Sequence, residues 1–330
     1  MSLISFIIPV YNGENYIKRC LLSILNQKSS IEIIIINDGS TDQSISIMQS
    51  TYKSYNPNNH ELRIITTSNK GVANARNLGI RLAKSPYIAF VDQDDFITAD
   101  FCSIFVPYIN EDSYDIIISG FYRKNEKNII TRKFLPLNYP WTKYCLIYPW
   151  GRVYKRDFLL NNNINFLKTS IGEDVYFNMV AYSKTNNICI LSKYSYIWFD
   201  NPHSVSNKQY TTINKVINPI YTFDKILSDK RTPSYSSFEF EEYFFIKFIV
   251  WYLLSNSKKS ERSNLIQMRN KLFSWLQIHY PNFRKNKYCC LVFPKGDLLF
   301  NSIIVKLYMV AFRLHADKLL LLLINWFFHH

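Results

Sequence analysis

The sequence of 330 residues is poor in glycine and proline, with 8 and 12 of them, which argues against a fibrous chain or a flexible linker. Its six cysteines form no CxxC pair and no Cys/His pattern at zinc spacing, so neither a disulfide framework nor a structural zinc site is expected. Reduced thiols in a cytosolic protein fit this pattern best. The glycine motifs GxGxxG and GxxxxGK[ST] are also absent, so the sequence supports neither a dinucleotide-binding fold nor a P-loop.

Long apolar runs are missing as well. The longest uncharged stretch near the C-terminus, 319–328, has 10 residues, too few to cross a bilayer. The apolar run within residues 1–9 has the length of a strand and no basic residues before it, so no signal peptide is expected.

The composition is otherwise that of a globular protein, with 48% hydrophobic and 16% aromatic residues. Charge is distributed unevenly. Residues 1–130 contain 12 Lys/Arg and 13 Asp/Glu, whereas residues 131–330 contain 27 and 12, a net charge of +15. A basic second half suggests nucleic acid or an anionic membrane surface as a partner, and lysines on a solvated surface are the simpler alternative.

Strand and helix patterns alternate over the first hundred residues, which predicts βαβ units and a mostly parallel sheet. The expected strands are 2–10 (with a break at Pro9), 31–36, 62–66 and 87–91, and the expected helices are 14–27, 43–52 and 72–84. The pattern then loosens, with a helix expected at 101–110, strands at 115–123 and 129–134, a helix at 175–183, and one or two strands at 187–199.

From about residue 210 the sequence becomes helical and aromatic, with helices expected at 238–254 and 258–276. The stretch 298–328 predicts one very apolar helix whose polar residues form a narrow stripe: Ser302, Lys306, Arg313 and Asp317. Such a helix either packs in a helical subdomain or lies in a membrane interface, and the nearby aromatic and basic residues favour the interface. We therefore expect deletion of residues 297–330 to release the protein from anionic vesicles.

Four polar loops follow the first four expected strands and should gather at one edge of the sheet, where α/β proteins bind ligands. They are 9–12, 37–40, 69–71 and 92–95. Their chemistry suits a nucleotide. Asp38 can accept hydrogen bonds from a base, Tyr11 offers a stacking face, and Lys70 and Arg76 can meet phosphates.

The fourth loop, Asp92-Gln93-Asp94-Asp95, places three carboxylates directly after a buried strand. One reading is a helix cap, because Asp is favoured at that position. The other is a site for Mg²⁺ or Mn²⁺, which take oxygen ligands and bridge to substrate phosphates. The three earlier loops favour the metal site, with Asp92 and Asp94 as ligands and Asp95 as a cap or an acceptor contact.

Together, Phe6–Asn12, Asn37–Asp42, Gly71–Asn77 and Asp92–Asp95 resemble the motifs of bacterial family 2 glycosyltransferases. The resemblance is dense over residues 3–100, thinner to about 206, and fades in the last 120 residues. It implies an α/β GT-A fold, a Rossmann-like mostly parallel sheet flanked by helices, with an α-helical C-terminal extension. The implied domains are a catalytic domain 1–206, with a nucleotide-sugar half 1–100 and an acceptor half 101–206, and a basic, aromatic helical region 207–330.

The resemblance also implies roles for individual residues. Asp38 would sit on the uracil of a UDP-sugar, Arg76 would face the diphosphate or sugar, and Asp94, with Asp92, would ligate Mn²⁺ or Mg²⁺. The donor-binding set is Pro9, Tyr11, Asn12, Asp38, Lys70, Arg76, Asp92 and Gln93.

Further along the chain, Asp174 beside Glu173 matches an acidic pair at a helix start, with Asp174 as the expected general base and helix capping as the alternative. His203, in a late loop, is a further candidate metal or phosphate contact, although a lone histidine is more often a plain polar contact.

The implied activity is inverting, metal-dependent transfer of a single sugar from a UDP-sugar to a glycan or lipid-linked glycan acceptor of the bacterial surface. The QxxRW motif of processive synthases is absent, which favours one transfer over polymerisation. Asn37 departs from the aspartate common in the family, which leaves the role of that position open. We expect a cytoplasmic protein, peripheral at the anionic inner membrane face, with homo-oligomers left open and no nucleic acid partner. The alternative is a non-catalytic nucleotide-binding or nucleic-acid-binding module.

Overall fold

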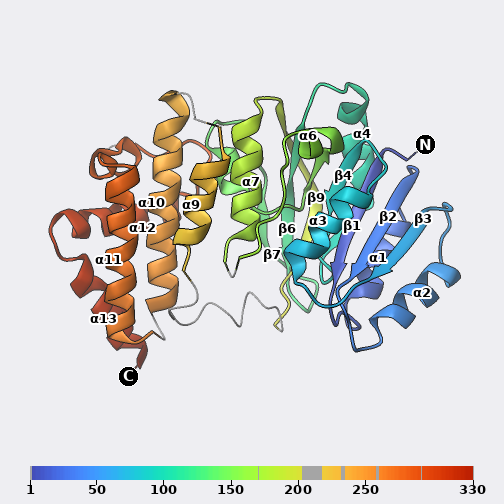
Figure 1. Cartoon of the computed structure of the whole chain (residues 1–330), viewed down its shortest axis with the longest axis horizontal. Helices are drawn as coiled ribbons and strands as arrows, with labels where there is room; N and C mark the ends of the chain where they lie inside the picture. Colours follow the sequence, from blue (N-terminus) through green and yellow to red (C-terminus); the bar gives the residue numbers. More distant parts are fainter. Residues whose placement is uncertain are drawn as a thin grey trace. The chain divides into compact units, whose positions relative to one another are not determined.

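The computed structural model describes residues 2–169, 171–202, 218–231, 235–257, 260–290 and 292–329 (Figure 1). The chain divides into two compact units, which we describe separately. Unit 1 comprises Met1–Asn138, Ile147–Lys168 and Glu173–Asn201, and unit 2 comprises Tyr139–Leu146, Thr169–Gly172 and Pro202–His330. The domain boundary predicted at residue 206 falls outside the described ranges.

Unit 1 begins with four parallel strands in the spatial order β3–β2–β1–β4. They are β1 (Ile4–Val10), β2 (Ile31–Asn37), β3 (Glu61–Thr66) and β4 (Tyr87–Phe90). Every residue of β1 and β2 is buried, as expected for apolar runs in a parallel sheet that is covered on both faces.

Strand β1 continues through Pro9, where the sequence predicted a break. Val91 N donates to Ile7 O, so the backbone groups of Ile7 face β4, and those of Pro9, two residues on, face the same side. Because β4 ends at Phe90, no ladder bond needs the N–H that proline lacks.

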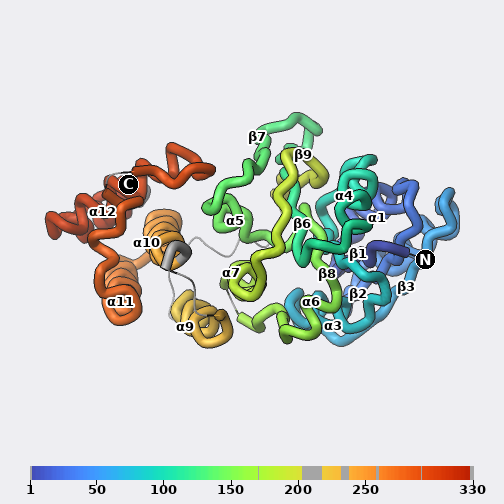
Figure 2. Tube along the Cα trace, turned by 90° about the horizontal axis from the view of Figure 1, so that it is seen from above, coloured from blue at the N-terminus to red at the C-terminus, as the bar shows by residue number. Residues whose placement is uncertain are grey.

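The first three helices cover both faces of this sheet. They are α1 (Ile17–Leu25), α2 (Ser44–Ser54) and α3 (Val72–Leu82). The chain moves outward from β1 to β3 and then crosses back to β4 on the other side of β1. Right-handed crossovers therefore place α1 and α2 on one face and α3 on the other, and Figure 2 shows α1 and α3 on opposite sides of β1. The strand order reverses at β1 and β4, which is where α/β sheets bind ligands.

The remaining strands extend the sheet in the order β4–β8–β6–β9–β5, with β7 on β6. They are β5 (Phe96–Ile97), β6 (Ile116–Lys124), β7 (Ile130–Phe134), β8 (Arg152–Lys155) and β9 (Ile188–Phe199). Strand β8 is antiparallel to both β4 and β6, whereas β9 runs parallel to β6. With α4 (Phe101–Asn110), α6 (Arg156–Asn161) and α7 (Glu173–Lys184), this is a mixed sheet flanked by helices, and the predicted fold class is confirmed.

Unit 2 is helical, as predicted for the C-terminal region. Its helices are α5 (Thr142–Cys145), α9 (Ile220–Asp229), α10 (Tyr235–Ser257), α11 (Arg262–His279), α12 (Leu299–Arg313) and α13 (Asp317–His329), with short turns η1 (Phe283–Lys285) and η2 (Lys287–Cys289). Helix α10 packs against α11, α12 and α13, and Figure 1 shows it beside α11. Among the described residues, no helix combines the length and the apolar character needed to span a bilayer.

The prediction of one helix over residues 298–328 is wrong. The stretch forms two helices, because the chain turns after Arg313 through His315, whose φ is 59°. Of the residues in the predicted polar stripe, Ser302 and Asp317 are buried inside unit 2. Their buried hydrogen-bond partners, which sequence periodicity cannot show, account for this position.

Candidate active site

The loops that follow the first four strands meet at one edge of the sheet, as strand polarity predicts. Asn12, after β1, joins the loop after β2: its N–H donates to Ser40 Oγ over 3.0 Å, and its Oδ1 accepts from Thr41 N over 2.8 Å. The loop after β3 follows, because Thr67 N donates to Asn37 O over 2.9 Å. The polar groups of three loops are therefore held as one surface.

Gln93 connects the loop after β4 to the loop after β1. Its Oε1 accepts from Tyr11 N at 2.9 Å, and its Nε2 donates to Tyr11 O at 3.1 Å. The side-chain amide of Gln93 thus makes both of the hydrogen bonds that the backbone of a paired strand would make with Tyr11. The Tyr11 side chain stays exposed at the same edge, whereas Pro9 is buried within β1.

Asp38, predicted to meet a base, is buried and already accepts two backbone hydrogen bonds. They come from Lys70 N at 2.8 Å and Gly71 N at 2.7 Å. Gly71 has a φ of 88°, a conformation that glycine adopts without strain. Asp38 therefore holds the loop before α3 in place, and a carboxylate has further lone pairs with which to accept from a ligand. The Lys70 side chain is exposed beside it.

Arg76 lies at the centre of the site and binds two of the predicted acids. Its Nη2 donates to Asp92 Oδ1 at 2.7 Å, and its Nη1 donates to Asp174 Oδ1 at 2.5 Å. The guanidinium is buried, and its Cζ lies 5.0 Å from the centre of the Phe166 ring. Asp92 and Asp174 lie 16 and 98 positions after Arg76 in the sequence. The fold therefore brings together one acid from the loop after β4 and one from the start of α7.

The other two acids of the loop after β4 have different surroundings. Asp94 Oδ2 accepts from Asn201 Nδ2 at 2.9 Å, and burial, with a contribution from Asp92, raises the pKa of Asp94. Asp95 is buried and accepts from Tyr196 Oη at 2.7 Å and from Phe199 N at 2.8 Å. Burial and the neighbouring Asp94 raise the pKa of Asp95 well above its usual range. Asp95 is thus a structural acid that joins the loop to β9.

Sequence reasoning missed two residues that order this acidic loop. Tyr196 of β9 accepts from Asp92 N at 3.2 Å while donating to Asp95. Arg19 of α1 donates from Nη2 to Asp94 O at 2.8 Å, and its guanidinium lies over the Phe199 ring. Neither residue stands in a motif, and only their spacing within an expected strand or helix gave a sign of where their side chains point.

The acidic loop fits a divalent cation in its chemistry. Asp92 and Asp94 each use one oxygen in the bonds above, and among the described residues the other oxygen of each has no hydrogen bond. Burial and the neighbouring Asp92 carboxylate raise the pKa of Asp94, and a cation bound between these carboxylates would favour their charged forms. No group of three or more His, Cys, Asp or Glu side chains in the described ranges is arranged to hold a metal, so a cation here would need ligands from the substrate. His203 lies outside those ranges.

Asp174 begins helix α7 beside Glu173, as predicted. Burial, together with the charges of Glu173 and Asp92, raises the pKa of Asp174 to about 8, and Arg76 opposes the shift. One guanidinium is shared between two carboxylates with a third nearby, so it neutralises Asp174 only in part. A carboxyl group with a pKa near neutrality is suited to exchange protons at physiological pH.

A buried polar cluster fixes the start of α7. Asn178, one turn after Asp174, donates from Nδ2 to Asp174 O at 3.0 Å, and its Oδ1 accepts from Arg152 Nη1 at 3.1 Å and Tyr154 Oη at 2.7 Å. Arg152 and Tyr154 come from β8, next to β4 in the sheet. The Asp174 carboxylate is therefore positioned by groups on a strand adjoining the acidic loop.

Comparisons with known proteins concern the family and the fold of the chain. Residues 5–168 match the family model described as Glycosyl transferase family 2. The uncharacterized glycosyltransferase EpsJ of Bacillus subtilis (strain 168) is 30% identical over 226 residues, which cover 64% of each chain. A poly(ribitol-phosphate) beta-glucosyltransferase of Bacillus spizizenii is 32% identical over 204 residues, covering 59% of this chain and 32% of that protein. This chain thus spans less than two thirds of either relative.

Similarity of fold extends further along the chain. The crystal structure of Staphylococcus aureus TarS 1-349 in complex with UDP-GlcNAc aligns with a TM-score of 0.59 at 19% identity, covering 98% of this chain and 90% of that one. At this identity the likeness concerns the fold alone.

Proposed function

The chain belongs to Glycosyl transferase family 2, and we propose that it is an inverting, metal-dependent glycosyltransferase that uses a UDP-sugar. It would move a single sugar to a hydroxyl group of a bacterial surface-glycan precursor, such as that of a capsule, an O-antigen or a lipooligosaccharide. The observation that carries the proposal is the pairing of Arg76 with both Asp92 and Asp174. It places a buried cation, a candidate metal ligand and a candidate base within one network.

The donor would bind across the edge formed by the loops after β1 to β4. Tyr11 offers an exposed ring for the uracil, and Asp38 offers lone pairs beyond those used by the loop before α3. Lys70, whose side chain is exposed, would supply positive charge for the diphosphate, whereas the buried Arg76 guanidinium is paired with Asp92 and Asp174. Asn12 and Gln93 act indirectly, because their side chains are used to hold the loops together.

Asp92 and Asp94 would hold Mn²⁺ or Mg²⁺ together with the diphosphate. When bound, such a cation stabilises the negative charge that develops on the UDP leaving group. The chain's own residues then keep the loop in place: Tyr196 fixes its backbone, and Asp95 links it to β9.

Asp174 would take the proton from the attacking acceptor hydroxyl. Such a hydroxyl has a pKa far above 7, so it needs a base as it attacks. Burial raises the pKa of Asp174, which makes this carboxylate a stronger base than an exposed aspartate. Attack from the face opposite UDP would invert the anomeric centre, so an α-linked donor would give a β-linked product. The charge of Glu173, in the same first turn of α7, would help to keep the pKa of Asp174 raised.

The acceptor would be a glycan or a lipid-linked glycan at the inner face of the bacterial plasma membrane. This assignment follows from the family and from the basic character of residues 131–330. Transfer of one sugar is proposed because the motif of processive synthases is missing from the sequence.

The proposal is tested by measuring UDP released from a panel of UDP-sugars by the purified full chain with Mn²⁺, alone and with lipid-linked acceptors. We expect slow hydrolysis of one or a few donors and faster UDP release once the correct acceptor is added. In calorimetry, UDP should bind more tightly with Mn²⁺, and Asp94→Ala should remove that metal-dependent gain. The matched control Asp157→Ala, at an exposed acid of α6, should keep it. Absence of UDP binding, together with salt-sensitive binding of single-stranded nucleic acid, would favour a nucleic-acid-binding module instead.

A further inference from the structure

Helices α12 and α13 of unit 2 carry large apolar side chains on their outer faces. On α12 and the residue after it, Phe300, Leu307 and Leu314 are 73%, 64% and 72% exposed. The spacing of these positions, with Ile303 and Val310 between them, places all five on one side of the helix. Leu319 and Leu323 continue an exposed apolar face on α13. We call these seven residues the outer stripe.

The opposite faces of the same helices are buried and include several polar groups. Ser302 donates to Asp297 over 2.7 Å, and Asn325 Nδ2 donates to Ser257 O and Ser260 O over 2.6 and 2.8 Å. At the start of α13, Asp317 accepts from Arg269 Nε over 2.6 Å. The helices are thus held to unit 2 by satisfied polar contacts and by buried apolar side chains such as Met309 and Leu321, and the seven residues of the outer stripe remain outside. Contiguous apolar faces of this kind mark interaction sites.

The charged groups around the outer stripe are cationic. Residues 280–330 contain seven Lys/Arg and two Asp. Both aspartates are buried and paired, Asp297 with Lys247 and Asp317 with Arg269, so neither contributes negative charge to the surface. Lys306 and Arg313 lie two turns apart on α12, along one border of the stripe. An apolar face bordered by cations complements an anionic lipid surface.

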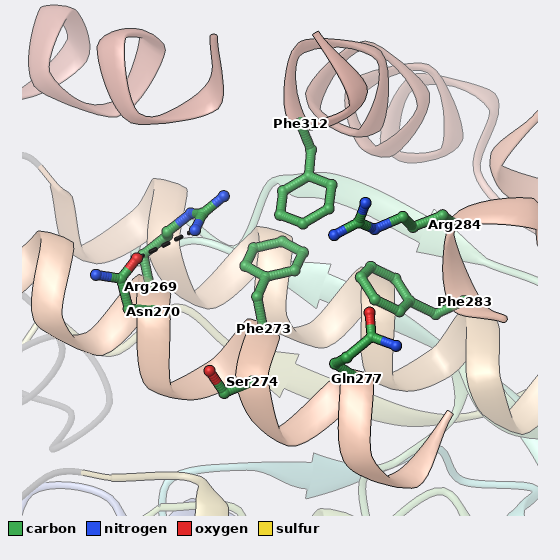
Figure 3. A pocket seen from close by; sticks show the side chains of 8 residues that line it. All are labelled: Arg269, Asn270, Phe273, Ser274, Gln277, Phe283, Arg284 and Phe312. Carbon is green, nitrogen blue, oxygen red and sulfur yellow. Dashed lines mark hydrogen bonds between the residues drawn. The ribbon is translucent and has the colours of Figure 1, made fainter. Parts of the chain in front are cut away.

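A groove between α11, η1 and α12 has a volume of about 280 Å³ and is lined by the rings of Phe273, Phe283 and Phe312 (Figure 3). Phe312 is buried and lies on the side of α12 opposite the outer stripe, so the groove is not part of that surface. The Arg313 guanidinium donates to the backbone of Arg284, with Nη2 at 2.7 Å from its carbonyl oxygen. The cations of α12 that border the stripe are therefore Lys306 and Arg313.

We propose that the outer stripe of α12 and α13 docks on an anionic phospholipid bilayer, with Lys306 and Arg313 at its border facing the lipid phosphates. The apolar side chains enter the acyl boundary, and Lys306 extends toward the headgroups. A second copy of the chain is a poorer occupant, because burying two such faces against each other would bring their cations together. The inference concerns unit 2 and does not depend on the transfer reaction.

The test is vesicle flotation of the full chain with phosphatidylglycerol and with phosphatidylcholine vesicles. We expect binding to phosphatidylglycerol that weakens as salt is raised, and much weaker binding to phosphatidylcholine. The pair Phe300→Gln and Leu307→Gln should reduce the affinity by about 100-fold, since each buried apolar side chain is worth about tenfold or more. Lys306→Gln and Arg313→Gln should each reduce it about fivefold, as expected for one cation near an anionic surface.

The matched control is Ile129→Gln, which replaces an exposed apolar residue of unit 1 and should leave vesicle binding unchanged. UDP binding should persist in every variant, which separates this inference from the proposed function. Equal binding of wild type and the stripe variant to both vesicles would overturn the proposal. So would a wild-type dimer that Phe300→Gln and Leu307→Gln convert to a monomer without any effect on vesicles, because the stripe would then be an interface between copies.

Discussion

Replacing Arg76 with alanine should destabilise unit 1, because it leaves two carboxylates without their shared cation. Asp92 and Asp174 are 28% and 25% exposed in their side chains, while the Arg76 side chain is 4% exposed. Breaking a buried ion pair by removing one partner costs about 3–5 kcal/mol. Because water reaches a quarter of each carboxylate, we expect the low end, about 3 kcal/mol of the free energy of unfolding.

The measurement should be made above pH 8, where Asp174 is ionised, since its pKa is raised to about 8. Native-state hydrogen exchange at the amides of β1 and β2 reports the free energy of unfolding at the core of unit 1. The matched control is Arg81→Ala, which removes an exposed arginine from the same helix and should cost less than about 0.5 kcal/mol.

A double-mutant cycle isolates the electrostatic part of the loss. In the Arg76→Ala background, Asp174→Asn should restore about 1 kcal/mol, because it removes one of two unpaired charges. Equal effects of Arg76→Ala and Arg81→Ala would refute the reasoning. A cycle with no coupling between positions 76 and 174 would assign the loss to packing against Phe166 instead.

Three further predictions concern neighbouring groups. The kcat/KM should rise with pH up to about pH 8, because Asp174 must be ionised to act as a base. The free energy of unfolding should change in the opposite direction: the contribution of Asp174 is fully present below about pH 4, the pKa of an unfolded aspartate, and is lost as the pH rises through about 8. Gln93→Ala should weaken UDP binding in calorimetry, because it frees the Tyr11 backbone, whereas Asn26→Ala, away from this edge, should not. Tyr196→Phe should lower the free energy of unfolding of unit 1 by about 1–3 kcal/mol in the same exchange measurement, since buried Asp95 loses a donor; an unchanged value would mean that water replaces the hydroxyl.

Much of the site could be predicted from sequence because its parts are local. Each polar loop follows an apolar strand, and parallel strands bring such loops to the same edge whatever their distance in sequence. The pairing of Arg76 with Asp174 could not be predicted in this way, because it depends on how α7 packs beside β8. The same holds for Tyr196 and Arg19, which act on the acidic loop through backbone groups that carry no side-chain signature.

The wrong predictions have local physical causes. Pro9 was predicted to break the strand because a proline has no N–H to donate. In the structure Pro9 faces β4, which ends at Phe90, so no hydrogen bond between the strands requires that N–H. Residues 298–328 looked like one helix because no proline or glycine interrupts them, but His315 adopts a positive φ and ends α12. Apolar content gave no orientation for these helices, since their buried faces are fixed by hydrogen bonds to distant residues such as Ser257.

The most direct test of the central claim is single-turnover transfer by Asp174→Asn, compared with the matched control Asp157→Asn. We expect Asp174→Asn to bind UDP as the wild type does, to keep its exchange protection in β1 and β2, and to transfer sugar about 10²–10⁴-fold more slowly, the usual contribution of a general base. Asp157→Asn should transfer at the wild-type rate. Transfer by Asp174→Asn at the wild-type rate would contradict the assignment of this buried carboxylate as the base.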